Sequence, residues 1–131
     1  MAEWSPVAAQ TLYGPRLGNN EPHLFVILND PMEFEGYAGT HCLMVSFSTV
    51  YPGVFHDPTC VVQAGAHDFI VHESFIHYRF TRFDRCSELV KLVQQGIFEP
   101  RTPCPNPPFA QIKAGLYQSR FTAKVYKALG I

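Results

Sequence analysis

Histidines beside apolar segments are the residues of this 131-residue sequence that are best suited to proton transfer. His67 and His72 flank the apolar triplet Phe69-Ile70-Val71, and the sequence holds six histidines in all. An unperturbed imidazole titrates near neutrality, at a pKa of roughly 6.5, and therefore exchanges protons readily. We predict that His67 or His72 acts as a general acid or base. The alternative for each is a surface position or a structural hydrogen bond.

Hydroxyl and guanidinium groups lie where expected strands end. Ser48 and Thr49 end one such strand, and a hydroxyl there contacts a phosphate or, alternatively, caps a turn. Arg79 and Arg82 follow a later strand, and a guanidinium can neutralise the charge of a phosphoryl transition state. These residues predict phosphate chemistry. The alternative is that the arginines pair with nearby acids such as Asp84.

Aromatic side chains and charge both favour a polyanionic partner. Tyr78 and Phe83 lie next to the arginines, as base-stacking residues do in proteins that bind single-stranded nucleic acids. Residues 67–131 hold nine bases and five acids, a net charge of +4, whereas residues 1–66 hold one base and six acids, a net charge of −5. A basic surface attracts RNA or DNA, although an ordinary solvated helix face is the alternative.

Signatures of cofactor and metal sites are missing from the sequence. It has no phosphate-binding glycine loop, no dinucleotide fingerprint and no zinc-protease motif. The four cysteines form no C-x-x-C pair, and a zinc site built from Cys42, Cys60, His67 and His72 would match no standard spacing. We therefore expect no metal, no cofactor and no disulfide framework.

Short β-rich segments separated by Gly and Pro loops should position these residues. We expect strands at His23–Leu28, His41–Phe47, Cys60–Val62, Phe69–Val71 and Ser74–Phe80. Strands of this length and spacing predict a mainly β protein with a small antiparallel sheet or barrel.

The apolar period changes in the last third of the chain. Leu89, Val90, Leu92 and Val93 predict a helix that ends at Gly96. Phe109, Ile112 and Leu116 predict a second helix, broken near Ser119. We interpret residues 1–131 as a single domain, with an irregular lead-in (1–21), a β body (22–83) and a helical C-terminal part (84–131) that contains a proline-rich connector (100–108).

The sequence shows neither a membrane-spanning segment nor a secretory leader. Its longest apolar run, Leu24 to Leu28, is far too short to cross a bilayer, and Met1 to Pro6 lacks a basic start. We expect a cytoplasmic protein without a membrane partner.

The order of these elements resembles the MazF/PemK group of bacterial endoribonuclease toxins. In that family an apolar strand ends in a Ser/Asn-Asp turn, as at Pro22–Asp30, and a second one ends in Thr/Ser, as at Leu43–Thr49. A later strand leads to an arginine, as Glu73–Ile76 leads to Arg82, and the closing helix ends as Ala128–Ile131 does. Residues 57–72 also resemble small uncharacterised bacterial relatives of this group.

The resemblance implies an SH3-like barrel with a C-terminal helix, usually a homodimer, that cleaves single-stranded RNA without a metal and is held by a protein antitoxin. It matches the family's arginine to Arg82. From the residues themselves we predict Arg82 as the transition-state clamp, Ser48 or Thr49 as a phosphate contact, and Arg79, Tyr78 or Phe83 as substrate contacts.

The sequence departs from the family pattern at two positions. Glu21 stands where a basic residue precedes the first strand, and Arg79 stands where the family has an acid. Acid–base work would then fall to His23, His67 or His72. The alternative function is a non-catalytic SH3-like module that binds a protein or a nucleic acid.

Overall fold

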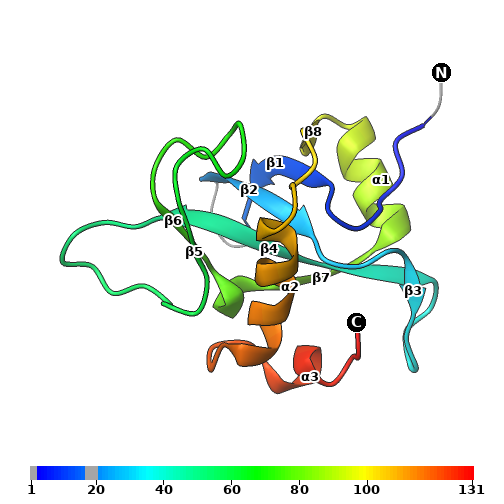
Figure 1. The fold of residues 1–131 in the computed structure, drawn as a ribbon. Coiled ribbons are helices and arrows are strands. Elements are labelled where there is room, and N and C mark those ends of the chain that lie inside the picture. The colour runs from blue at the N-terminus through cyan, green and yellow to red at the C-terminus, as the bar shows by residue number, and fades with distance from the viewer. Residues whose placement is uncertain (1–2, 17–20) are drawn as a thin grey trace.

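The long strand β4 (Thr40–Thr49) organises the computed structural model, which describes residues 3–16 and 21–131 (Figure 1). Residues 41–47 are all buried, because side chains on both faces of β4 contact apolar cores. Strands β2 (Pro22–Ile27) and β3 (Met32–Glu33) pair with β4 along one side. Strands β6 (Ser74–Ile76) and β7 (Arg82–Arg85) pair with it along the other.

The sheet is antiparallel in every pairing of the described residues, as predicted. Its order is β5-β6-β4-β2-β1-β8, where the additional strands are β1 (Thr11–Pro15), β5 (Val61–Val62) and β8 (Glu99–Arg101). This order has two open ends, so the described strands do not close into a barrel. The mainly β prediction is confirmed, whereas the SH3-like barrel is not.

Two helices cover opposite faces of the sheet. Helix α1 (Cys86–Gln94) buries Leu89 against one apolar cluster, which includes Phe25 and Met44. Helix α2 (Pro108–Gln118) buries Ile112 against the other cluster, on the far side of β4 (Figure 1). Alternation along β4 explains both clusters, since consecutive side chains of a strand point to opposite faces.

The predicted helices are present. Helix α1 is followed by Gly96, whose φ of 74° suits glycine in the left-handed region. Helix α2 starts at Pro108, where a missing N–H costs nothing, and ends at Ser119, which has extended backbone. A short helix, α3 (Lys124–Lys127), follows it.

The structure differs from the sequence interpretation at several places. Strand β1 lies in the predicted irregular lead-in, and β8 overlaps the predicted connector, where the sheet edge tolerates Pro100. The predicted strand at 74–80 stops at Ile76 and becomes the 3₁₀ helix η1 (Tyr78–Phe80). Residues 69–71 form no strand. Pairing between strands that are distant in sequence decides which of these segments are strands. Local turn-forming residues in the same segments gave no sign of that pairing.

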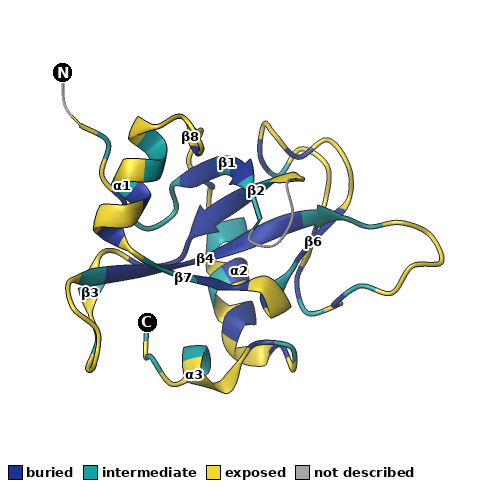
Figure 2. Ribbon diagram, turned by 180° about the vertical axis from the view of Figure 1, so that it is seen from behind, coloured by how far each residue is buried: buried dark blue, intermediate teal, exposed yellow. Residues whose placement is uncertain are grey.

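The loops beyond the C-terminal end of β4 are mostly exposed, in contrast to the buried strands (Figure 2). They comprise residues 50–60, between β4 and β5, and residues 63–73, between β5 and β6. Within the described residues, no helix has the length and apolar character needed to cross a membrane.

Candidate functional site

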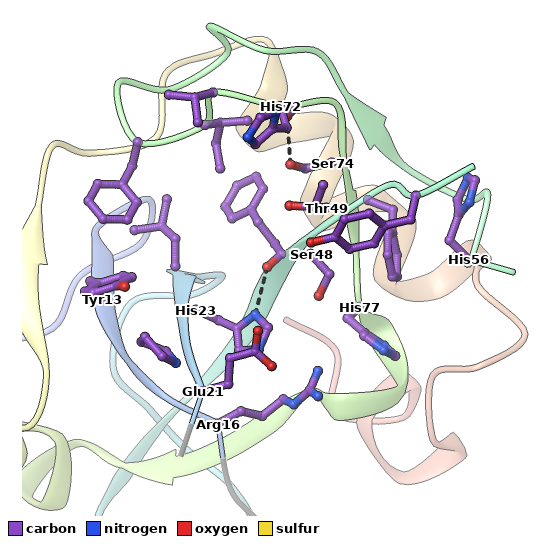
Figure 3. A pocket seen from close by; sticks show the side chains of 18 of the residues that line it. Tyr13, Arg16, Glu21, His23, Ser48, Thr49, His56, His72, Ser74 and His77 are labelled. Atoms are coloured by element: carbon purple, nitrogen blue, oxygen red, sulfur yellow. Dashed lines mark hydrogen bonds between the residues drawn. The ribbon is translucent and has the colours of Figure 1, made fainter. Parts of the chain in front are cut away.

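A cleft of about 490 Å³ lies at the C-terminal end of β4, between its two loops and the start of β2. Four of the six histidines line it: His23, His56, His72 and His77 (Figure 3). The cleft therefore gathers most of the groups of this chain that transfer protons near neutral pH.

Strand register brings three of the polar side chains together on the floor of the cleft. Phe25 on β2 pairs with Ser46 on the antiparallel strand β4. Two residues toward the start of β2 and toward the end of β4, the same register places His23 beside Ser48. The backbone N–H of His77 donates to the Ser46 carbonyl at 2.9 Å, which places His77 on the other side of β4. Figure 3 shows His23, Ser48 and His77 near one another at the floor of the cleft.

Each of these three side chains carries a buried polar atom that has no hydrogen-bond partner in the described structure. The atoms are Nε2 of His23, Oγ of Ser48 and Nδ1 of His77. Unpartnered buried polar atoms are uncommon because each loses its hydration without compensation. Three of the five such atoms among the described residues belong to side chains that line this cleft, which makes its floor the candidate site.

His23 is oriented by its second ring nitrogen. Its Nδ1 lies 3.2 Å from the Phe47 carbonyl oxygen. A carbonyl oxygen only accepts hydrogen bonds, so Nδ1 carries the proton in this contact. The other ring nitrogen, Nε2, is buried on the cleft floor and has no partner among the described residues.

His77 is held neutral by its surroundings. Burial, together with the nearby positive charges of Arg16, Arg79 and His23, lowers the pKa of His77 to about 4, while Asp57 opposes the shift. At neutral pH this imidazole is an uncharged proton acceptor. Arg16 lines the cleft, with its guanidinium 4.3 Å from the centre of the Phe80 ring.

The structure brings four of the predicted site residues to the cleft: His23, Ser48, Thr49 and His72. His72 is exposed at the rim, where Ser74 Oγ donates to its carbonyl oxygen at 2.9 Å (Figure 3). Thr49 is half-buried at the end of β4. Of these, His23 and Ser48 reach the floor.

Two other predicted residues make structural contacts elsewhere. His67 is buried, with Nε2 bonded to the Thr102 carbonyl and Nδ1 accepting from the Phe69 N–H at 2.9 Å. Both ring nitrogens are therefore occupied. Tyr78 is buried too, and its hydroxyl donates to the Ile112 carbonyl at 2.6 Å, which ties η1 to α2.

Arg82 lies apart from the cleft, which corrects the predicted grouping of this arginine with the Ser48–Thr49 strand end. It is buried opposite Met44, and its guanidinium forms a two-bond pair with Asp84 at 2.8 and 3.0 Å. The same group lies 5.0 Å from the centre of the Phe98 ring. This position gives no support to a role as transition-state clamp.

Phe83 and Arg79 also lie outside the cleft. Phe83 stacks on His41, with ring centres 4.6 Å apart and planes at 13°, in an aromatic cluster with Tyr37 and Tyr126. Arg79 lines a smaller neighbouring cavity.

The sequence analysis missed His77 and Arg16. His77 follows Phe75 by two residues, and the predicted strand 74–80 already placed both on one face. The backbone contact between His77 and Ser46, which brings His77 to the cleft, could not be predicted from any local sequence pattern. Arg16 is the only base in the first half of the sequence.

Among the described residues, no three His, Cys, Asp or Glu side chains are grouped so that they could hold a metal ion. Comparison of the chain with protein-family models, with curated proteins and with solved structures finds no match.

Proposed function

We propose that this protein is an endoribonuclease that cleaves single-stranded RNA without a metal, using the 2′-hydroxyl of the RNA as nucleophile. The observation that carries the proposal is the set of unpartnered atoms on the cleft floor, His23 Nε2, Ser48 Oγ and His77 Nδ1, beside Arg16. Two imidazoles, a hydroxyl and a guanidinium are the groups that such a transesterification needs.

In the proposed reaction His77 is the general base. Its lowered pKa keeps it neutral, so it can take the proton of the 2′-hydroxyl. The 2′-oxygen then forms a bond to the adjacent phosphorus while the bond from phosphorus to the 5′-oxygen breaks. The products are a 2′,3′-cyclic phosphate and a 5′-hydroxyl.

His23 is the proposed general acid. In its protonated form Nε2 donates a proton to the departing 5′-oxygen, while the Phe47 carbonyl holds Nδ1 and fixes the ring. The Ser48 hydroxyl donates to a non-bridging phosphoryl oxygen, and Arg16 offsets the charge that develops there. Thr49, at the end of β4, is the proposed substrate contact nearer the rim.

The biological setting belongs to the same proposal. On the resemblance at Pro22–Asp30 and Leu43–Thr49, the chain acts in the bacterial cytoplasm as the homodimeric toxin of a toxin–antitoxin pair. Pro22–Asp30 begins at the cleft and Leu43–Thr49 ends there, so an antitoxin that covers the cleft would block the reaction.

Purified protein, incubated with single-stranded RNA in excess EDTA, tests the activity. We expect cleavage by the wild type and a loss of about 10²- to 10⁴-fold in kcat/KM for His23→Gln and for His77→Gln. His72→Gln, at the exposed rim of the same cleft, is the matched control and should keep most of the activity.

RNA that stays intact at high protein concentration would contradict the proposal. Tight RNA binding with a steep salt dependence and no products would indicate instead the non-catalytic binding module. The exposed side chains of Tyr51 and Phe55 on the loop after β4 are the feature that favours this second candidate.

A further inference from the structure

A second cavity, of about 180 Å³, adjoins the cleft and shares part of its wall. His77, Phe55, His56 and Phe75 line both spaces. Anything bound in the second cavity therefore lies next to the proposed general base.

The walls of this cavity are aromatic and cationic. Phe55 is 70% exposed and meets the half-buried Phe121 edge to face, with ring centres 5.8 Å apart. The guanidinium groups of Arg79 and Arg120 lie 5.0 and 4.8 Å from the centre of the Phe121 ring. These side chains come from the loop after β4, from η1 and from the segment after α2, and together they resemble the stacking platforms that bind bases.

Asp57 supplies one polar group to the cavity. Burial alone would raise the pKa of Asp57, but hydrogen bonds from Ser119 and Thr59 outweigh it and lower the pKa, so the carboxylate is ionised at neutral pH. Oδ1 accepts two bonds from Thr59, whereas Oδ2 accepts one, from Ser119 at 2.5 Å. Oδ2 therefore keeps one acceptor position, which suits an N–H group on a base edge.

We propose that this Phe55–Phe121 cavity is a nucleobase subsite. It binds the base of a nucleotide that adjoins the scissile phosphate, by stacking on the exposed ring of Phe55, with Phe121 against the edge, and by hydrogen bonding to Asp57. The inference rests on the proposed ribonuclease function for the identity of the ligand. It moves base recognition away from Tyr78, which is buried, and from Phe83, which lies in the aromatic cluster with His41.

Fluorescence of 2-aminopurine tests the subsite. The probe replaces one base of a short oligonucleotide whose 2′-hydroxyls are methylated, so that it cannot be cleaved, and each position is tried in turn. Stacking on an aromatic ring quenches the probe. We expect quenching at one position with the wild type, and its loss, with about tenfold weaker binding, for Phe55→Leu.

The choice of variants separates stacking from folding. Phe55 is mostly exposed, so Phe55→Leu should fold normally, and Phe121→Leu gives a second reading from the opposite wall. Tyr37→Leu is the matched control, because Tyr37 is an exposed aromatic residue that does not line either space. Binding without quenching at any position, or an equal effect of Tyr37→Leu, would overturn the proposal.

Cleavage of matching unmethylated RNA, measured in parallel, distinguishes the subsite from the activity. Quenching that depends on Phe55 without any cleavage would support the subsite and contradict the ribonuclease. Cleavage without quenching would do the reverse. If both hold, an abasic residue at the quenched position should slow the wild type about tenfold and slow Phe55→Leu much less.

Discussion

Two serines on β4, Ser46 and Ser48, have similarly buried hydroxyl groups but differ in whether they line the cleft. Ser46 and Ser48 point to the same face of the strand, and the hydroxyl of each is buried without a hydrogen-bond partner. Only Ser48 lines the cleft. A buried hydroxyl without a partner contributes nothing to folding that would offset its lost hydration. Because both serines lack a partner, it is the position of Ser48 in the cleft that distinguishes it from Ser46 and makes it the candidate for ligand contact.

Replacing these serines gives paired predictions. Ser48→Ala should leave the free energy of unfolding unchanged within about 0.5 kcal/mol, or raise it, because no hydrogen bond is lost. It should lower kcat/KM for RNA cleavage roughly 10²-fold, the effect of removing one donor to a developing oxyanion. Ser46→Ala should match it in urea denaturation and leave cleavage intact. Equal activity losses in both variants would contradict the assignment.

His77 should make the fold sensitive to acid. Its pKa is about 4 in the folded protein and near 6.5 when unfolded, so the unfolded state binds more protons between these values. Stability is then retained above pH 6.5 and lost as the pH falls toward 4, by about 1 kcal/mol per pH unit from this residue. Denaturation across that range should show a shallower loss for His77→Gln.

His72→Gln is the matched control for acid sensitivity, since His72 is exposed. A slope for His77→Gln equal to that of the wild type would show that His77 is not held neutral by the fold.

The sequence predicted the place of a candidate site residue correctly where its neighbours in the sequence determine its position in the fold. Ser48 lies near the end of β4, which the following turn residues mark, whereas His23 lies at the start of β2, directly after the predicted irregular lead-in. Arg82 carried the same local signal, but its partner Asp84 and the ring of Phe98 bury it. Whether an arginine meets a ligand or a carboxylate depends on tertiary contacts, which short sequence patterns do not contain.

At the scale of elements, η1 and α2 hold His77 in place. Tyr78 follows His77 directly, and its hydroxyl donates to the Ile112 carbonyl in α2. Gly115 makes this approach possible, since a Cβ there would overlap the Tyr78 hydroxyl and ring. The contact connects the helical C-terminal part to the floor of the cleft.

Gly115→Ala should therefore destabilise the protein by about 1–3 kcal/mol, as overpacking of a core does. The loss should occur although alanine favours a helix by about 1 kcal/mol over glycine. Urea denaturation measures it, and the Tyr78→Phe background should reduce the loss, because part of the overlapping group is gone. A stabilising Gly115→Ala would show that Tyr78 and α2 do not pack as described.

Elements were predicted well where their signal is local. Helices α1 and α2 follow from apolar spacing, Gly96 and Ser119, and β4 follows from an apolar run. Strands β1 and β8 were missed because Gly14, Pro15 and Pro100 favour turns. In the structure β1 pairs with β2 and β8 pairs with β1, and this pairing overrides the local preference.

At the scale of the whole molecule, the chain is close to neutral, with a net charge of −1. Arg16 and Arg79 both lie close enough to lower the pKa of His77, while Glu21 lines the cleft together with Arg16. The apolar clusters on the two faces of β4 fix the strands that carry His23 and Ser48, and they thereby hold the cleft floor in place.

The most direct measurement is cleavage of a DNA oligonucleotide that contains a single ribonucleotide, in excess EDTA, with products identified by mass. If His23, Ser48 and His77 direct a 2′-hydroxyl at phosphorus, cleavage occurs only after the ribonucleotide and leaves a 2′,3′-cyclic phosphate and a 5′-hydroxyl. Cleavage of the all-DNA strand, a 5′-phosphate product, or no cleavage after any single ribonucleotide in the series of positions would contradict the account.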